Sequence, residues 1–161
     1  MVFGTPDRPA FHGQDEWRHI RSATSNGHWI PAEGEELRSV LSQLRDARVA
    51  AMQIRVISPF RMVADQAMKV HESVFPEVSG RDREKWVGTV HTMQGKEADV
   101  VILVLGGDPD RPSARRFATQ EPNLLNVVLT RAKRRLYVIG NRGTWGNEPY
   151  FNVLAARIPA G

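Results

Sequence analysis

Apolar residues along this chain follow two spacings, one typical of helices and one typical of buried strands. Leu37, Val40, Leu41 and Leu44 recur at helical spacing after Pro31 and predict a helix whose first turn is acidic. A second stretch with this spacing predicts a helix over about residues 60–75. Short apolar runs predict strands at residues 17–20, 28–30, 52–58, 86–90, 98–105 and 136–140.

The alternation of strands and helices indicates an α/β fold with a mostly parallel sheet. The run at residues 98–105 is almost entirely aliphatic, as expected for a strand that helices cover on both faces. Two later helices are predicted over residues 122–132 and 147–157. Loops are predicted at residues 76–82 and from residue 106 through residue 116.

Length and composition fit one domain, because 161 residues are enough for a single core. Residues 1–16 are rich in glycine, proline and charge and are predicted to form an arm with little order, followed by the domain at residues 17–161. The net charge of +4 permits a nucleic-acid partner but does not require one.

Composition also argues against several classes of site. The chain has no cysteine, so disulfides and thiolate metal sites are excluded. Its five histidines are not spaced like clustered ligands, and we expect no metal site. No apolar run approaches the roughly 20 residues that span a bilayer, and the first ten residues lack the apolar centre of a signal peptide. We therefore expect a cytoplasmic protein without a membrane partner.

Two polar segments are candidates for ligand binding. The first follows the predicted strand at residues 86–90 and contains Thr89, His91, Thr92, Gln94, Gly95 and Glu97. Ligands of open parallel sheets sit beyond the carboxyl ends of the strands, where hydroxyl and backbone N–H groups can bind phosphates. The second segment contains Arg131, whose planar guanidinium suits phosphate. Composition alone favours a simple polar turn and an arginine at a helix C-terminus.

Tryptophans and basic clusters leave two interpretations open. The chain could stack bases on Trp17, Trp29, Trp86 and Trp145, but strand tryptophans are more often core residues, and we favour the core for Trp86. The basic groups at residues 115–116 and 133–135 could form a nucleic-acid patch or a solvated face.

Three motifs in order resemble those of superfamily 1 helicases. Residues 89–102, Thr-Val-His-Thr-Met-Gln-Gly-Lys-Glu-Ala-Asp-Val-Val-Ile, are similar to motif V of that family. Residues 125–133, Leu-Asn-Val-Val-Leu-Thr-Arg-Ala-Lys, are similar to motif VI, and residues 56–61, Val-Ile-Ser-Pro-Phe-Arg, resemble motif IV. The branch that it most resembles contains the RNA-surveillance helicases and the replication helicase-nucleases. The resemblance covers about residues 17–140.

The resemblance implies a fold and a set of residue roles. The fold would be a RecA-like three-layer sandwich, of the P-loop NTPase type but without its own P-loop. Arg131 would be the catalytic arginine that reaches the γ-phosphate across a domain cleft. Gln94, Gly95 and Glu97 would contact ATP, with Glu97 near the ribose, while Asn126 and Thr130 would support the motif VI helix. The implied nucleic-acid contacts are Ser58, Pro59, Arg61, Thr89, His91 and Thr92.

The sequence departs from the family pattern in two ways. In motif IV, Phe60 replaces a tyrosine, and Val63 stands where the branch often has glutamine. More importantly, the chain has no Gly-x-x-x-x-Gly-Lys-(Ser/Thr) loop to cradle phosphates, and no strand-terminal Asp-Glu pair to hold Mg²⁺. Those parts belong to the first motor domain of such helicases.

We therefore interpret the chain as the second motor domain of an ATP-dependent superfamily 1 DNA or RNA helicase. Its partners would be the first RecA-like domain of the same protein and single-stranded DNA or RNA. ATP and Mg²⁺ would bind in the full-length protein, none would be held by this chain alone, and the isolated chain would be inactive. One alternative is a non-enzymatic nucleic-acid-binding or scaffold module that retains the fold. Another is a different, self-sufficient nucleotide enzyme, which the missing glycine loop argues against.

Overall fold

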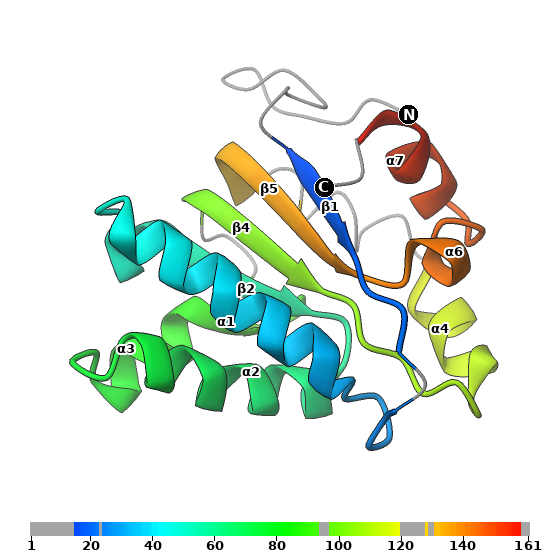
Figure 1. Ribbon diagram of the computed structural model, residues 1–161, viewed down its shortest axis with the longest axis horizontal. Helices are drawn as coiled ribbons and strands as arrows, with labels where there is room; N and C mark the ends of the chain where they lie inside the picture. The colour runs from blue at the N-terminus through cyan, green and yellow to red at the C-terminus, as the bar shows by residue number, and fades with distance from the viewer. Residues whose placement is uncertain (1–14, 23, 94–96, 120–127, 129–130, 159–161) are drawn as a thin grey trace.

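The protein is described by a computed structural model that covers residues 15–22, 24–93, 97–119, 128 and 131–158 (Figure 1). Within these residues the strands form one sheet in the order β1-β5-β4-β2-β3, and every pairing is parallel. The strands are β1 Glu16–His19, β2 Ile54–Ser58, β3 Val87–Thr89, β4 Ala98–Val104 and β5 Ala132–Gly140. The prediction of an α/β fold with a parallel sheet is confirmed.

Helices cover both faces of this sheet and make a three-layer sandwich (Figure 1). The long helices α1 and α2 pack side by side on one face, and the short helices α6 and α7 lie on the other. The described helices are α1 Pro31–Asp46, α2 Arg61–Val74, α3 Gly80–Trp86, α4 Pro112–Thr119, α6 Arg142–Trp145 and α7 Phe151–Arg157, with a 3₁₀ turn at Ala51–Gln53.

The central position of β4 in the sheet explains why its sequence is almost continuously apolar. Val101 and Leu103 point into the core beneath α6 and α7, whereas Val100, Ile102 and Val104 point into the core beneath α1 and α2. Because successive strand residues face opposite sides, a strand covered on both faces needs apolar residues at every position. The predicted burial of this strand on both sides is confirmed.

Several predicted boundaries are wrong, and short capped helices explain most of the differences. The predicted loop through residue 116 contains α4, whose first residue Pro112 has the fixed φ that suits a first helical turn. The predicted loop at residues 76–82 contains the start of α3, because the Ser79 hydroxyl accepts a hydrogen bond from the Asp82 N–H at 3.1 Å. The predicted final helix begins four residues later than expected, as α7, and the separate short helix α6 precedes it.

Two predicted strand segments are also different in the structure. Residues 28–30 form no strand: Asn26 and Trp29 make an isolated bridge, and Ile30 is the N-cap residue of α1. Trp86 ends α3 and is only half-buried, so it is not a strand residue. By contrast, Trp17 and Trp145 are fully buried, and each donates its indole N–H to a backbone carbonyl.

The first described residues are fixed to the last strand. The Asp15 carboxylate accepts a hydrogen bond from the Leu136 N–H at 2.9 Å, and the Trp17 indole N–H donates to the Gly140 carbonyl at 3.2 Å. Strand β1 thus begins at Glu16, one residue before the predicted domain boundary. Residues 1–14 of the predicted arm lie outside the described part of the chain.

Candidate functional site

The parallel sheet has two distinct ends, and the predicted site residues divide between them. We call the end where the strands finish the C-terminal edge and the end where they start the N-terminal edge. Ser58 and Thr89 are paired in register at the C-terminal edge. Ala98 and Ala132 are paired at the N-terminal edge, so the residues before them, Glu97 and Arg131, lie at that opposite end. The expectation that Glu97 shares the C-terminal edge with Thr89 is therefore wrong.

At the C-terminal edge, the motif IV segment forms a tight turn into α2. Ser58 is only 1% exposed, and its hydroxyl accepts a hydrogen bond from the Phe60 N–H at 3.1 Å. Phe60 stacks on His28 with ring centroids 4.1 Å apart and planes 8° from parallel. Pro59 is half-buried, and Arg61 is exposed at the first residue of the helix. Ser58 therefore shapes the turn, while Arg61 is accessible.

The motif V segment forms a second turn at the same edge. The Thr92 hydroxyl accepts from the Thr89 N–H at 2.9 Å and donates to the Thr89 carbonyl at 3.0 Å. A hydroxyl has one proton to donate, so Thr92 closes its own turn and has no second donor for a phosphate. Thr89 is buried, and His91 is exposed beside it. The sequence pattern alone did not indicate this internal use of Thr92.

At the N-terminal edge, carboxylates and basic side chains alternate across two strands. The Lys133 ammonium lies 3.6 Å from the Glu97 carboxylate, and the Arg134 guanidinium lies 3.6 Å from Asp99. Asp99 also accepts a hydrogen bond from the Gln53 amide at 2.8 Å. Sequence reasoning did not single out Gln53 or Asp99, because they became neighbours only when β2, β4 and β5 aligned.

Arg131 differs from the basic residues that follow it. Lys133 and Arg134 have ion-pair partners, and Arg135 donates to the Tyr137 hydroxyl at 2.7 Å and lies over its ring. The Nε of Arg131 is buried and has no hydrogen-bond partner, although the residue as a whole is half-buried. Buried donors without a partner are rare in proteins and call for an explanation.

Four predicted site residues lie outside the described part of the chain: Gln94, Gly95, Asn126 and Thr130. Between the latter two, Val128 is described and is fully buried in the core beneath α6 and α7. Within the described ranges, no cluster of three or more His, Asp or Glu residues could hold a metal ion. Those ranges also contain no helix long and apolar enough to cross a membrane.

The basic groups noted in the sequence have separate surroundings. Arg115 lies in α4 and pairs with Glu148 at 2.9 Å, whereas residues 133–135 lie in β5 at the N-terminal edge. Arg116 is exposed. The two groups therefore do not form one patch, because α4 follows the C-terminal end of β4 (Figure 1).

A buried carboxyl near the C-terminal edge was noticed in the sequence only as part of a helix start. Glu33 is 2% exposed, and its carboxyl accepts a hydrogen bond from the Gly106 N–H at 2.8 Å. Burial raises the pKa of Glu33 to about 8, and the Gly106 hydrogen bond opposes that rise. Gly106 has a φ of +62°, and a Cβ there would come within 2.5 Å of the His28 carbonyl oxygen. Glycine at this position lets β4 leave the sheet against the start of α1.

Comparison with known proteins places the chain among helicases. The sequence profile of the AAA_12 family, described as an AAA domain, matches residues 7–143. A regulator of nonsense transcripts 1 homolog from Drosophila melanogaster is 22% identical over 92% of this chain and 12% of its own length. The DNA polymerase alpha-associated DNA helicase A of Saccharomyces cerevisiae is 33% identical over 63% of this chain and 14% of its own length.

One further relative and one solved structure are similar to this chain. The DNA polymerase alpha-associated DNA helicase A of Schizosaccharomyces pombe is 26% identical over 83% of this chain and 19% of its own length. The solved C-terminal domain of a possible DNA helicase from Lactobacillus plantarum WCFS1 aligns with a TM-score of 0.48 and 13% identity, covering 91% of this chain and 80% of that one.

The family match covers most of the chain, and the chain itself spans only a small share of its curated relatives, between 12% and 19% of their lengths. The region that matches includes all five strands of the sheet. The chain therefore belongs to the AAA_12 family of AAA domains, which is found in superfamily 1 helicases.

Proposed function

We propose that this chain forms one wall of an ATP site that it shares with a first motor domain, with Arg131 as the catalytic arginine. The observation that carries the proposal is the state of Arg131 itself. Its Nε is buried without a hydrogen-bond partner, while the basic side chains that follow it are engaged within the chain. A guanidinium left in this state suits a phosphate that arrives from outside the domain.

Glu97 is proposed to contact the ribose of the same nucleotide. It lies at the same end of the sheet as Arg131, since Ala98 and Ala132 are paired in register. Its ion pair with Lys133 joins side chains that are 50% and 55% exposed, and exposed ion pairs contribute little to stability. A ribose hydroxyl could replace Lys133 at this carboxylate at small cost.

The described residues of this wall suit ATP better than they suit Mg²⁺. The Arg131 guanidinium, whose Nε has no hydrogen-bond partner, suits the triphosphate, whereas the described residues offer no cluster of carboxylates for the metal ion. In the proposed arrangement the first domain would supply the phosphate-cradling loop and the Mg²⁺ ligands. This chain would contribute positive charge at the phosphoryl transition state, an effect worth roughly 10³–10⁵ in rate where such arginines act.

The C-terminal edge is proposed to contact single-stranded nucleic acid. Arg61 and His91 are exposed there, on two turns that lie against each other through the hydrogen bond from the Val90 N–H to the Ser58 carbonyl at 3.3 Å. The N-cap residue of α2, Phe60, has no side-chain hydrogen bond to the helix start, so backbone N–H groups remain for a phosphate. Ser58, Pro59, Thr89 and Thr92 would then act mainly by shaping these turns.

The test compares Arg131→Ala with Arg134→Ala in the complete protein. Because the charge of Arg131 would act when the γ-phosphate leaves, Arg131→Ala should lower nucleic-acid-stimulated ATP hydrolysis by roughly 10³-fold or more while ATP affinity changes little. Arg134→Ala removes an exposed partner of Asp99 and should change the rate far less. Arg131→Lys should rescue poorly, since lysine lacks the two-donor fork.

Melting curves of all variants separate chemistry from folding. A near-normal rate of ATP hydrolysis in Arg131→Ala would overturn the assignment of the arginine. A defect that merely follows lost thermal stability would overturn it as well, and would favour a module that binds nucleic acid without hydrolysing ATP.

A further inference from the structure

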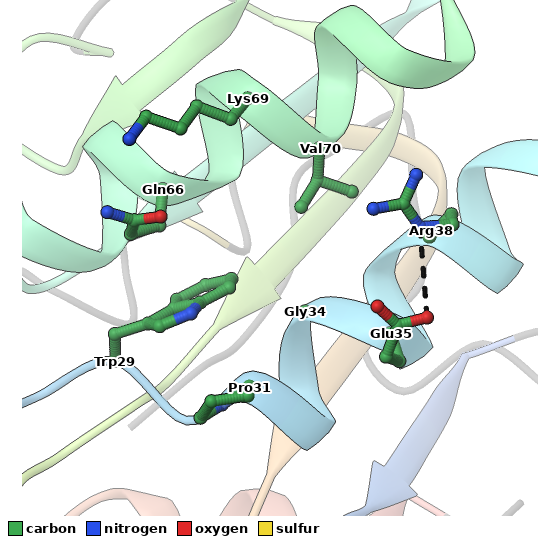
Figure 2. A pocket seen from close by; sticks show the side chains of 8 residues that line it. All are labelled: Trp29, Pro31, Gly34, Glu35, Arg38, Gln66, Lys69 and Val70. Atoms are coloured by element: carbon green, nitrogen blue, oxygen red, sulfur yellow. Dashed lines mark ion pairs between the residues drawn. The ribbon is translucent and has the colours of Figure 1, made fainter. Parts of the chain in front are cut away.

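The space between α1 and α2 contains a groove of about 220 Å³ (Figure 2). Trp29 and Pro31 line one end, Val70 lies at the base, and the side chains of Gln66 and Lys69 line the α2 side. Pockets for drug-sized ligands are usually about 300–1,000 Å³. This smaller space suits a single planar ring and leaves the rest of a longer ligand outside.

Trp29 supplies an aromatic surface in a fixed position. A Cβ at Gly34 would come within 2.4 Å of the Trp29 ring, so only glycine lets the indole lie directly against α1. The bridge between Asn26 and Trp29 fixes the backbone of the same turn. Figure 2 shows the ring between Pro31 and Gln66, with Lys69 beyond it. A half-buried aromatic ring held in this way is ready to stack on a planar group.

The polar side chains on the α1 side of the groove already have partners, whereas those on the α2 side have none among the described residues. Arg38, on α1, is already engaged: it donates to the Ser73 hydroxyl at 2.6 Å and lies 3.8 Å from the Glu35 carboxylate. Neither the Gln66 amide nor the Lys69 ammonium has a partner among the described residues. An anion would therefore bind on the α2 side, because the Glu35 carboxylate repels it from the α1 side.

The groove is joined to the C-terminal edge through the same turn. His28 stacks on Phe60 of the motif IV turn, and Met62 lies so close to Gly27 that a Cβ there would contact its sulfur at 2.9 Å. Arg61 and Lys69 are eight positions apart on α2, so they lie roughly two turns and 12 Å apart along its axis and about 80° apart around it. A chain that contacts Arg61 can continue along α2 to Lys69.

We infer that this groove is a base-stacking subsite for single-stranded nucleic acid, which extends the strand path along α2. One base stacks on Trp29, the Gln66 amide faces the edge of that base, and Lys69 contacts a backbone phosphate. The inference rests on the proposed nucleic-acid contacts at the C-terminal edge. Stacking is independent of base identity, since every base has a flat aromatic face.

The experiment measures binding of a fluorescein-labelled single-stranded oligothymidylate, and in a parallel series oligouridylate, by fluorescence anisotropy over a range of salt concentrations. The variants of the 161-residue chain are Trp29→Leu and Lys69→Gln. Their matched controls are Trp86→Leu, a half-buried tryptophan outside the groove, and Lys85→Gln, an exposed helical lysine paired with Asp82. Arg61→Gln tests the C-terminal edge separately.

Trp29→Leu should weaken binding about tenfold without changing the salt dependence, because it removes stacking and no charge. Lys69→Gln should flatten the slope of log affinity against log salt by about 0.7, the value for one phosphate contact on a single strand. The two controls should change neither quantity. NMR signals of the Trp29 indole should shift on addition of oligonucleotide, with those of Trp86 unchanged.

The outcomes separate the subsite from the C-terminal edge. If Arg61→Gln weakens binding while Trp29→Leu and Lys69→Gln bind like wild type, the subsite is overturned and the edge contacts stand. If the groove variants weaken binding and Arg61→Gln does not, the subsite stands and the edge proposal fails. Absence of any binding at millimolar protein overturns both. Lys69→Gln changes an exposed side chain, so its result holds even if Trp29→Leu lowers stability.

Discussion

Burial shifts the pKa values of two ionisable side chains of this domain, Glu33 and His71, in opposite directions. Each is neutral in the folded protein near pH 7, because burial penalises the charged form. Burial raises the pKa of Glu33 to about 8, whereas burial and the nearby Arg83 guanidinium lower the pKa of His71 to about 4. On unfolding, Glu33 therefore releases a proton between about pH 4.5 and 8, whereas His71 takes one up between about pH 4 and 6.5.

Glu33 predicts a loss of stability as pH rises. Its pKa is about 8 when folded and near 4.5 when unfolded, so between these values the folded state binds the additional proton. The contribution of protonated Glu33 is complete below about pH 4.5 and is lost as pH rises through 8, with a slope of at most about 1.4 kcal/mol per pH unit. Glu33→Gln, which stays neutral, should gain stability relative to wild type across this range.

Chemical denaturation of both proteins at several pH values measures this difference. Glu35→Gln is the matched control, because Glu35 lies on the same helix and is exposed. A difference between Glu33→Gln and wild type that stays constant from pH 5 to about pH 8 would show that the carboxyl is ionised in the folded protein.

The motifs selected candidate residues for the site, but the use of each side chain depends on how the chain folds. The resemblance selected Arg131 and Glu97, and the structure places both at the N-terminal edge. It also selected Thr92 as a backbone contact, yet that hydroxyl closes a turn with Thr89. The burial of Glu33 depends on Gly106, which is 73 positions away and has no signal in the local pattern.

At the scale of elements, a buried arginine attaches α3 to the end of α2. Arg83 is 5% exposed and donates to the carbonyl oxygens of Phe75 at 2.8 Å and Val78 at 2.9 Å, and to His71 Nδ1 at 3.3 Å. Both carbonyls lie beyond Val74, the last residue of α2, so the guanidinium ties the segment that follows α2 to α3.

Arg83→Ala should therefore lower the free energy of unfolding by about 2 to 3 kcal/mol, because it removes charge-assisted hydrogen bonds to the carbonyls of Phe75 and Val78 and leaves Phe75 with only the Val78 N–H as a donor. The exposed neighbour Arg81→Ala should change it by less than about 0.5 kcal/mol. Urea unfolding at neutral pH measures both. Equal stability of the two variants would mean that water replaces the guanidinium at these carbonyls.

Elements with an apolar stripe were predictable, and short capped helices were not. Helices α1 and α2 bury residues at helical spacing; the predicted start of α1 near Pro31 is confirmed, and the predicted bounds of α2 are confirmed within one residue. Helix α3 buries Arg83 alone and α4 buries Thr119 alone, so neither has an apolar period. Their starts are set by Ser79 and Pro112, signals that also occur in loops.

At the scale of the whole molecule, the sheet direction was predictable but the position of the site along it was not. Parallel strands alternating with helices predicted the fold. The sequence order of Thr89 and Glu97 suggested one site, whereas the chain between them crosses from one edge of the sheet to the other. The proposed nucleic-acid contacts and the proposed nucleotide contacts therefore lie at opposite edges of the sheet, and one stretch of the chain joins them.

The proposal that the ATP site is shared with a first motor domain gives a prediction for the chain by itself. The purified 161-residue chain should release no phosphate from ATP above background, with or without single-stranded nucleic acid, because its sequence has no phosphate-cradling glycine loop. A sensitive phosphate-release assay checks this. Turnover that survives repeated purification and falls in Arg131→Ala would show that the chain holds a complete site.

The pairing of β1 with β5 also has a consequence for biosynthesis. Trp17 is fixed to Gly140, 123 positions later in the chain, and Asp15 to Leu136, 121 positions later. A ribosome adds roughly 5–20 residues per second, so the first strand waits about 6 to 25 s for its neighbour to be synthesised. During that interval the apolar face of Trp17 has no partner in this sheet, and nascent chains that pause before residue 140 should depend most on chaperones.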